Sequence, residues 1–214
     1  MAELAHPVAH QFDDAEQQRD AASLGMWVFL VTEVMFFGGM FTAYVVYRAL
    51  FPHAFGHASN HLDVRLGTIN TAVLIASSLT MALAVRATQV GPPGAALRWL
   101  APTAALGATF LTIKTVEYAH KFHEGLVPGP HFTYAGPDAA QAQLFFSVYF
   151  AMTGVHALHL AIGIGMLAWL AGQVRRGRVG PSYYNPVEVG GLYWHFVDIV
   201  WIFLFPLLYL IGRH

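Results

Sequence analysis

Glu33 is a single carboxylic acid near the middle of a long apolar stretch, and an acid at that depth is a candidate for proton handling. The stretch runs from Leu24 to Tyr47, which is long enough to cross a bilayer because a membrane helix needs about 20 residues. No basic residue lies three or four positions away in the same helix. The carboxyl group must therefore find a donor on another helix, lie beside water, or stay protonated through desolvation.

Other apolar stretches carry ionisable side chains as well. Lys114 and Glu117 are three residues apart, so they share a helical face and can pair. The same spacing separates two histidines in the next stretch, and a histidine from an aspartate in the last one. Such groups often form interhelical hydrogen bonds, worth about 0.6 kcal/mol each, that determine how membrane helices pack. The sequence thus predicts an intramembrane polar network made of Glu117, His156, His159, His195 and Asp198.

Some of these spacings also suit metal ions. Two imidazoles on one helical face, as in His156 and His159, can ligate a transition metal. Glu117 and His120 match the Glu-x-x-His element of di-iron bundles, but the one further match lies in the polar N-terminal segment, and such bundles also need two more glutamates. Bis-histidine haem ligation needs facing histidines, which His156, His159 and His195 could supply. From the residues alone, a membrane b-type haem protein is the leading enzymatic alternative.

Five histidines fall in predicted loops, where an unperturbed imidazole has a pKa of about 6.5 and could collect protons. Exposed histidines without any such role are the ordinary alternative. The five are His53, His57 and His61 in the first outer loop, and His123 and His131 in the second.

The composition is that of a multi-pass membrane protein. Of the 214 residues, 56% are hydrophobic and 11% are charged, whereas globular proteins carry about 25% charged residues. The formal net charge of −1 argues against nucleic acid as a partner, since that requires a basic face. The chain has no cysteine, so disulfides, iron–sulfur clusters and thiolate metal sites are excluded. We expect a single all-α membrane domain.

Hydropathy predicts five transmembrane helices within residues 24–214. Residues 1–23 are polar and acidic, so we expect a cytoplasmic tail there and no secretory signal peptide. The fourth span is longer than a bilayer requires and should tilt or protrude. Gly and Pro mark the connections, among them Pro52 and Gly56 in the first loop. The predicted spans are residues 24–47, 66–88, 99–122, 141–173 and 192–211.

Basic residues near the spans predict the orientation. With the N-terminus inside, six arginines lie on the inner side and four basic residues lie on the outer side. We therefore expect a cytoplasmic N-terminus and an outer C-terminus. Trp99, Trp194 and Tyr209 lie near span ends, which is typical of interfacial anchors. Trp27, Trp194 and Trp201 are candidates for lipid binding or packing.

Taken in order, these segments resemble subunit III of the haem–copper terminal oxidases, the cytochrome c oxidase family, over about residues 24–212. The strongest marker is Tyr193-Trp-His-Phe-Val-Asp-Ile-Val-Trp-Ile-Phe-Leu204, which is similar to the closing helix of the family. The segment Trp27-Val-Phe-Leu-Val-Thr-Glu-Val-Met-Phe-Phe37 resembles the family helix whose buried glutamate reacts with carbodiimides. Shorter matches follow in the family order at Asn70-Thr71, Leu106-Gly107, Glu117-Tyr118 and residues 153–159.

The resemblance implies a V-shaped helical subunit of the bacterial inner membrane that docks directly on the catalytic subunit I. Haem and copper are expected in partner subunits and not in this chain, and subunit II and cytochrome c complete the expected complex. Family members hold phospholipid in the cleft of the V, support proton uptake, and protect the active site against turnover inactivation. Carried over, Glu33 is the carbodiimide-reactive acid, whereas Glu117, His156, His159, His195 and Asp198 are internal polar positions and not ligands.

The sequence departs from the seven-helix form of the family, because the two N-terminal helices of that form have no counterpart here. Bacterial short forms exist, in which those helices can be fused to subunit I, so the complete lipid cleft is not expected from this chain alone. Quinol oxidases and a nitric-oxide-reductase accessory protein have relatives of this shape, which leaves the electron donor open. A stand-alone transporter or channel is the alternative of another class.

Overall fold

Six α-helices and a closing π-helix make up the chain in the computed structural model, which describes residue 8 and residues 10–92, 94–136 and 138–211. The all-helical fold is the one that the sequence predicts. The elements are α1 (Ala15–Leu50), α2 (Pro52–Ser59), α3 (Val64–Val90), α4 (Leu97–His123), α5 (Ala139–Arg175), α6 (Asn185–Phe205) and the π-helix η1 (Pro206–Leu210).

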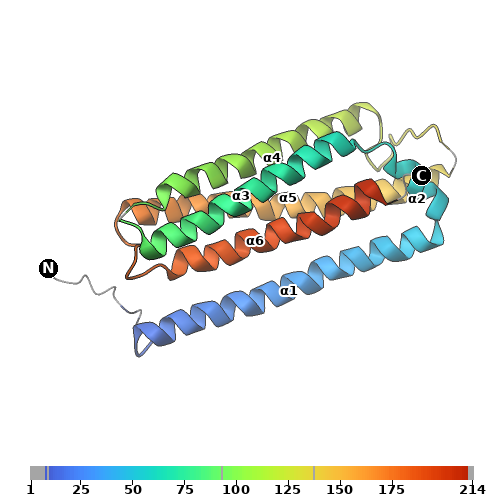
Figure 1. Cartoon of the computed structure of the whole chain (residues 1–214). Coiled ribbons are helices and arrows are strands. Elements are labelled where there is room, and N and C mark those ends of the chain that lie inside the picture. Colours follow the sequence, from blue (N-terminus) through green and yellow to red (C-terminus); the bar gives the residue numbers. More distant parts are fainter. Residues whose placement is uncertain (1–7, 9, 93, 137, 212–214) are drawn as a thin grey trace.

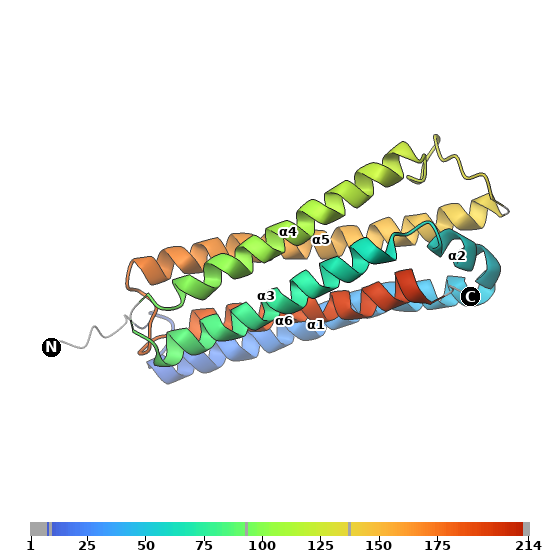
Figure 2. The same cartoon turned by 45° about the horizontal axis from the view of Figure 1, so that its top comes forward.

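The long helices run side by side along one axis (Figures 1 and 2). Helix α3 packs against α4 and α6, and α5 closes a four-helix ring by packing against the same two helices. Helix α1 lies outside this ring, against α6 and α5. The predicted V shape is not matched, because the helices form one bundle and not two diverging arms. Helix α1 begins and η1 ends at opposite ends of this bundle (Figure 1).

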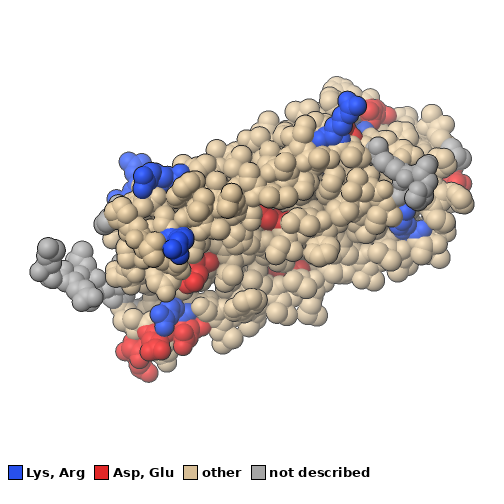
Figure 3. All heavy atoms as spheres, viewed as in Figure 1, with Lys and Arg blue, Asp and Glu red and all other residues tan. Residues whose placement is uncertain are grey.

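Four helices are long and apolar enough to cross a membrane: α1, α3, α5, and α6 together with η1. Helix α4 has the same length as α3, 27 residues, but it carries Lys114, Glu117 and Lys121, all of which are buried. The five predicted spans thus correspond to four apolar helices and one long helix whose charges face inward. On the face shown in Figure 3, Lys and Arg lie near the two ends, and the middle is almost free of charge apart from small acidic areas.

Two helical segments extend beyond the predicted spans. Helix α1 begins at Ala15, within the predicted tail, because the Asp14 carboxylate accepts a hydrogen bond from the backbone N–H of Gln17 at 2.7 Å. The rest of that tail falls partly on residues 1–7 and 9, which lie outside the described residues. Helix α2 occupies the predicted first loop, since Pro52 takes a first-turn position where its missing N–H is not needed.

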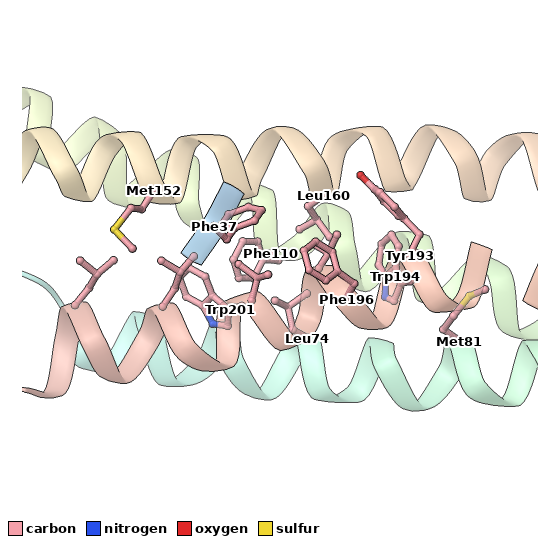
Figure 4. Packing of buried hydrophobic residues seen from close by; sticks show 14 of the residues in the cluster. Phe37, Leu74, Met81, Phe110, Met152, Leu160, Tyr193, Trp194, Phe196 and Trp201 are labelled. Carbon is pink, nitrogen blue, oxygen red and sulfur yellow. The ribbon is translucent and has the colours of Figure 1, made fainter. Parts of the chain in front are cut away.

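The core of the ring is aromatic (Figure 4). Trp194 and Trp201 on α6 are fully buried, and their indole N–H groups donate to Ser77 and Thr71 on α3, both at 3.0 Å. Tyr209 is fully buried as well. The expectation that Trp194 and Tyr209 are interfacial anchors is therefore wrong, because the polar atom of each ring finds its partner inside the protein.

Small residues make room for the Trp194 indole. A Cβ atom at Gly107 would lie 2.7 Å from Cη2 of Trp194, whereas one at Gly165 would meet nothing within 4 Å. We predict that Gly107→Ala lowers the free energy of unfolding by about 1–3 kcal/mol, because the indole must shift within a filled core. Unfolding by SDS titration measures this, with Gly165→Ala as the matched control, for which we expect a change within about 0.5 kcal/mol. Equal stability of the two variants would contradict the prediction.

Candidate functional site

Glu33 finds its partner on a helix that is distant in the sequence. Its Oε2 atom lies 3.1 Å from Nε2 of His159, which joins α1 to α5. Both side chains are mostly buried, with 17% of Glu33 and 14% of His159 exposed. Of the three possibilities that the sequence leaves open, a donor on another helix is the one found.

The other hydrogen bond of His159 determines how many protons the pair holds. Its Nδ1 atom lies 2.9 Å from the carbonyl oxygen of Val155, which can only accept, so Nδ1 carries a hydrogen atom. One further proton then lies between Nε2 and Glu33, on the imidazole or on the carboxyl group. The pair has no net charge in either arrangement, which suits its largely apolar surroundings.

Aromatic residues from two helices hold His159 in place. Phe37, one helical turn after Glu33, contacts the imidazole edge-on, with 5.3 Å between ring centroids. The Tyr193 hydroxyl donates to the His159 carbonyl oxygen at 2.9 Å, which connects α6 to the same turn of α5. Helices α1, α5 and α6 therefore meet at the pair.

A second polar cluster lies buried between α4, α5 and η1. Nζ of Lys114 lies 3.1 Å from Oε2 of Glu117, which confirms the predicted pairing. Tyr149 and Tyr209 donate to Oε1 of Glu117 at 2.9 and 2.6 Å, and their hydroxyls accept from Lys114 at 3.2 and 2.8 Å. Lys114 is 3% and Glu117 is 1% exposed. The two opposite charges therefore compensate each other within a shared set of hydrogen bonds.

The third group involves α3 and α6. His195 and Asp198 share a helical face, but His195 forms its hydrogen bond with Ser78, whose hydroxyl oxygen lies 2.8 Å from Nδ1 of the imidazole. Asp198 is 3% exposed, and neither of its carboxyl oxygens has a hydrogen-bond partner within the described ranges. Asp198 is therefore a buried acid beside the His195–Ser78 pair.

The predicted polar network is thus divided into separate groups. Glu117 belongs to the Lys114 cluster, His159 pairs with α1, and His195 pairs with α3. His156 is buried, neither of its ring nitrogens has a hydrogen-bond partner among the described residues, and its ring packs against Phe110 and Trp201. Of the histidines considered for haem ligation, His159 bonds to α1 and His195 bonds to α3. Within the part of the chain that the structure describes, no group of three or more His, Cys, Asp or Glu could hold a metal ion.

Sequence reasoning missed the tyrosines that complete the Lys114 cluster. A signal was present, because a carboxylate has about four acceptor sites and one ammonium group cannot satisfy a buried one. Tyr149 and Tyr209 lie 32 and 92 residues from Glu117, so no local pattern identifies them.

A groove of about 490 Å³ lies between α1 and α6, beside the Glu33 pair. Its walls are almost wholly apolar and include Trp27, Leu30 and Val34 from α1 and Phe196 and Phe203 from α6. Trp27 is 58% exposed at this groove, unlike Trp194 and Trp201, which belong to the core. A groove of this chemistry fits an acyl chain.

The five loop histidines are all exposed. Two of them, His53 and His57, lie on α2, and His61 follows that helix. His123 is the last residue of α4, and His131 lies in the connection between α4 and α5. His61 approaches the carbonyl oxygen of His57, and its ring lies 5.4 Å from that of Tyr134. A role for these histidines in collecting protons stays a prediction.

Comparison with known proteins matches the chain to a family of oxidase subunits, and the relatives are named for either a quinol oxidase or a cytochrome c oxidase. The model of the family "Cytochrome c oxidase subunit III" matches residues 8–213. The chain is 31% identical over 210 residues to the cytochrome bo(3) ubiquinol oxidase subunit 3 of Pseudomonas aeruginosa, which covers 97% of this chain and 93% of the relative. It is 32% identical over 206 residues to the cytochrome c oxidase subunit 3 of Thermostichus vulcanus, and the match covers 94% of this chain and 92% of the relative. It is also 32% identical over 190 residues to the quinol oxidase subunit 3 of Bacillus subtilis, with 88% and 86% covered.

Proposed function

Because the chain belongs to the cytochrome c oxidase subunit III family, we propose that it is the accessory, non-redox subunit of a proton-pumping haem–copper terminal oxidase. Subunit I is its direct partner, and haem and copper lie in the partner subunits. The Glu33–His159 pair carries the proposal, since it places one shared proton between two membrane helices.

The pair is suited to support proton uptake. Its proton can move between the two atoms that are 3.1 Å apart without changing the net charge of the pair. Uptake of a second proton, or release of the shared one, gives the pair one unit of charge, which is costly at this depth, so the pair relays a proton only when uptake and release are closely coupled. The bundle then contributes proton uptake, assembly and lipid binding to the complex.

We also infer that all five long helices cross the bacterial inner membrane. Helix α4 lies between α3 and α5 and matches α3 in length, and its buried charges do not face lipid. An odd number of crossings agrees with the opposite positions of the start of α1 and the end of η1 (Figure 1). The distribution of basic residues supports a cytoplasmic N-terminus.

A quinol is the second candidate for the electron donor of the complex. Relatives named for a quinol oxidase and for a cytochrome c oxidase match the chain at similar identity, 31% and 32%. Identities this similar do not distinguish the two donors, so the partner subunits must be identified to decide between them.

Isolation of the tagged chain from its native membranes in mild detergent tests the function. We expect co-purification of a larger subunit with haem and copper, and of a copper-bearing subunit II if cytochrome c is the donor. A Soret band in the chain alone would support the haem-protein alternative. A chain that moves solute in vesicles and has no oxidase subunit bound to it would support a transporter.

Bound phospholipid gives a separate prediction. Gly38 lines the groove between α1 and α6, and a Cβ atom there meets nothing within 4 Å, as is also true of Gly39 outside the groove. Gly38→Leu should fill part of the groove and reduce phospholipid retained after delipidation by about half or more, because the acyl chain loses apolar contacts. Mass spectrometry of extracted lipid measures this, and Gly39→Leu should retain the wild-type amount. Equal retention in both variants would place the lipid elsewhere.

A further inference from the structure

A polar cavity of about 490 Å³ lies at the end of the bundle where α3 begins and α4 ends. Helix α4 diverges from α3 toward this end (Figure 2), and the connection between α2 and α3 lines the cavity as well. The volume is within the range of about 300–1,000 Å³ that is usual for small-ligand sites. The polar side chains of its walls include Asn60, Asp63 and Arg65 on one side and His120, Lys121 and Glu124 on the other.

Two opposite charges in this cavity have no counter-charge. Among residues 10–92, 94–136 and 138–211, the Arg65 guanidinium group forms neither an ion pair nor a hydrogen bond, although Asp63 is two residues away. The Asp63 carboxylate accepts hydrogen bonds through Oδ1 from the backbone N–H groups of Arg65 and Leu66, at 2.8 and 3.2 Å, and no described residue bonds to its Oδ2. The other charged side chains of the lining are paired, Lys121 with Glu124 and Glu117 with Lys114.

One free cation and one free acid match a ligand that carries both a phosphate and a primary ammonium group. A guanidinium group binds phosphate oxygens through charge-assisted hydrogen bonds. A primary ammonium group has three N–H donors, and Asn60, Asp63 and Glu124 offer acceptor oxygens in the same cavity. A quaternary ammonium group has no N–H donor, so the cavity distinguishes ethanolamine from choline.

The position of the cavity favours a phospholipid as the source of this ligand. Arg65 is the second residue of α3, and Lys121 lies two residues before the end of α4, so both lie where the proposed spans leave the hydrocarbon. One helical turn deeper, four residues from Arg65 on α3 and from His120 on α4, the same two faces carry exposed apolar side chains. These are Ile69 and Val116, which are 52% and 47% exposed. Acyl chains can lie on them below the cavity, whereas a free solute gains nothing from them.

We propose that this cavity binds the headgroup of a phosphatidylethanolamine-type phospholipid, with the phosphate on Arg65 and the ammonium group on Asp63. The inference rests on the proposed crossing of the membrane by α3 and α4. The site is separate from the groove between α1 and α6, whose walls are almost wholly apolar and offer a headgroup no such charges. It adds a lipid site that selects by headgroup.

Photolabelling measures the headgroup preference at the site itself. Phosphatidylethanolamine, phosphatidylcholine and phosphatidylglycerol, each with a diazirine in the acyl chain, are added in turn to the full chain in detergent micelles. Mass spectrometry locates the adducts. At the peptides that contain Ile69 and Val116, phosphatidylethanolamine should give about tenfold more adduct than either other lipid, because phosphatidylcholine has no N–H donor and phosphatidylglycerol has no ammonium group. Leu30 and Phe41, which line the other groove, should be labelled equally by all three lipids.

Two variants each remove one charge of the site. Arg65→Gln should lower phosphatidylethanolamine labelling at the site about tenfold, because the phosphate loses its cation. Asp63→Asn keeps the N-cap of α3, since asparagine caps a helix as well as aspartate does, but it should lower phosphatidylethanolamine labelling to the level of phosphatidylcholine. Arg98→Gln is the matched control, because Arg98 is the exposed second residue of α4, at the opposite end of that helix, and labelling should not change.

Equal labelling of the site by all three lipids, or the same loss in Arg98→Gln as in Arg65→Gln, would overturn the proposal. Free phosphoethanolamine should not displace the lipid, and displacement at a concentration equal to that of the lipid would make a soluble solute the ligand and overturn the lipid site. None of these results requires a partner subunit. A chain that co-purifies with oxidase subunits and shows no headgroup preference refutes the lipid site alone, whereas a chain with the preference and no oxidase subunit refutes the proposed function alone.

Discussion

Lys114→Met should lower the free energy of unfolding of this chain by about 3–5 kcal/mol, because it leaves the Glu117 carboxylate buried without its cation. Glu117 is 1% exposed, and its remaining donors, Tyr149 and Tyr209, are neutral hydroxyls. Methionine keeps most of the volume of the lysine stem, so the effect reports the charge and not a cavity. Unfolding by SDS titration in mixed micelles is the measurement.

The same helix offers a matched control. Lys121 and Glu124 form an ion pair with the same three-residue spacing, but 50% of the Glu124 side chain is exposed. Lys121→Met should therefore change the free energy of unfolding by less than about 1 kcal/mol, because the carboxylate that it leaves unpaired is half exposed. The double variant Lys114→Met/Glu117→Leu should recover much of the lost stability, since it removes both buried charges. A loss below about 1 kcal/mol for Lys114→Met would show that the cluster is not a buried ion pair.

Glu33→Gln should abolish labelling of the chain by a membrane-soluble carbodiimide, because the reagent adds to a carboxyl group and an amide offers none. Glu33 is the most accessible of the three acids placed within the bundle, with 17% of its side chain exposed. Glu117 and Asp198 are 1% and 3% exposed, so the reagent does not reach them without local unfolding. Mass spectrometry of the labelled chain locates the adduct.

Assembly of the complex should survive this substitution, because glutamine is able to keep a hydrogen bond to His159 at the same position. Glu16→Gln, in the exposed first turn of α1, is the control and should leave labelling unchanged. Labelling that persisted in Glu33→Gln would move the reactive acid elsewhere and remove the support for proton handling at this pair.

The long helices and their order follow from the sequence, because crossing a bilayer demands about 20 apolar residues and this signal is read without knowledge of neighbours. The ends of the helices follow less directly. Asp14 caps α1 and extends it into a polar segment where hydropathy predicts no helix. Helix α2 forms because Phe55 and Ala58 are fully buried against the bundle. Hydropathy contains neither kind of information.

Whether a polar pair can be predicted from the sequence depends first on whether its two residues lie on one helix or on different helices. The spacing of Lys114 and Glu117 determines their pairing, since side chains three apart meet on any helix. The spacing of His195 and Asp198 is the same, yet their side chains do not bond, because packing against α3 brings Ser78 to His195 instead. A shared face makes a contact possible, and competition from other helices decides whether it forms.

The sequence alone determined that Glu33 lies within a membrane helix and lacks a partner there, since hydropathy and helical spacing are local properties. Only the tertiary structure decided that His159, 126 residues away, supplies the partner, and that the Asp198 carboxyl group has no hydrogen-bond partner among the residues that the structure describes. The physical reason is that each helix satisfies its own backbone. Which polar side chains meet is then decided by how the helices pack, and that depends on the apolar side chains of the whole bundle.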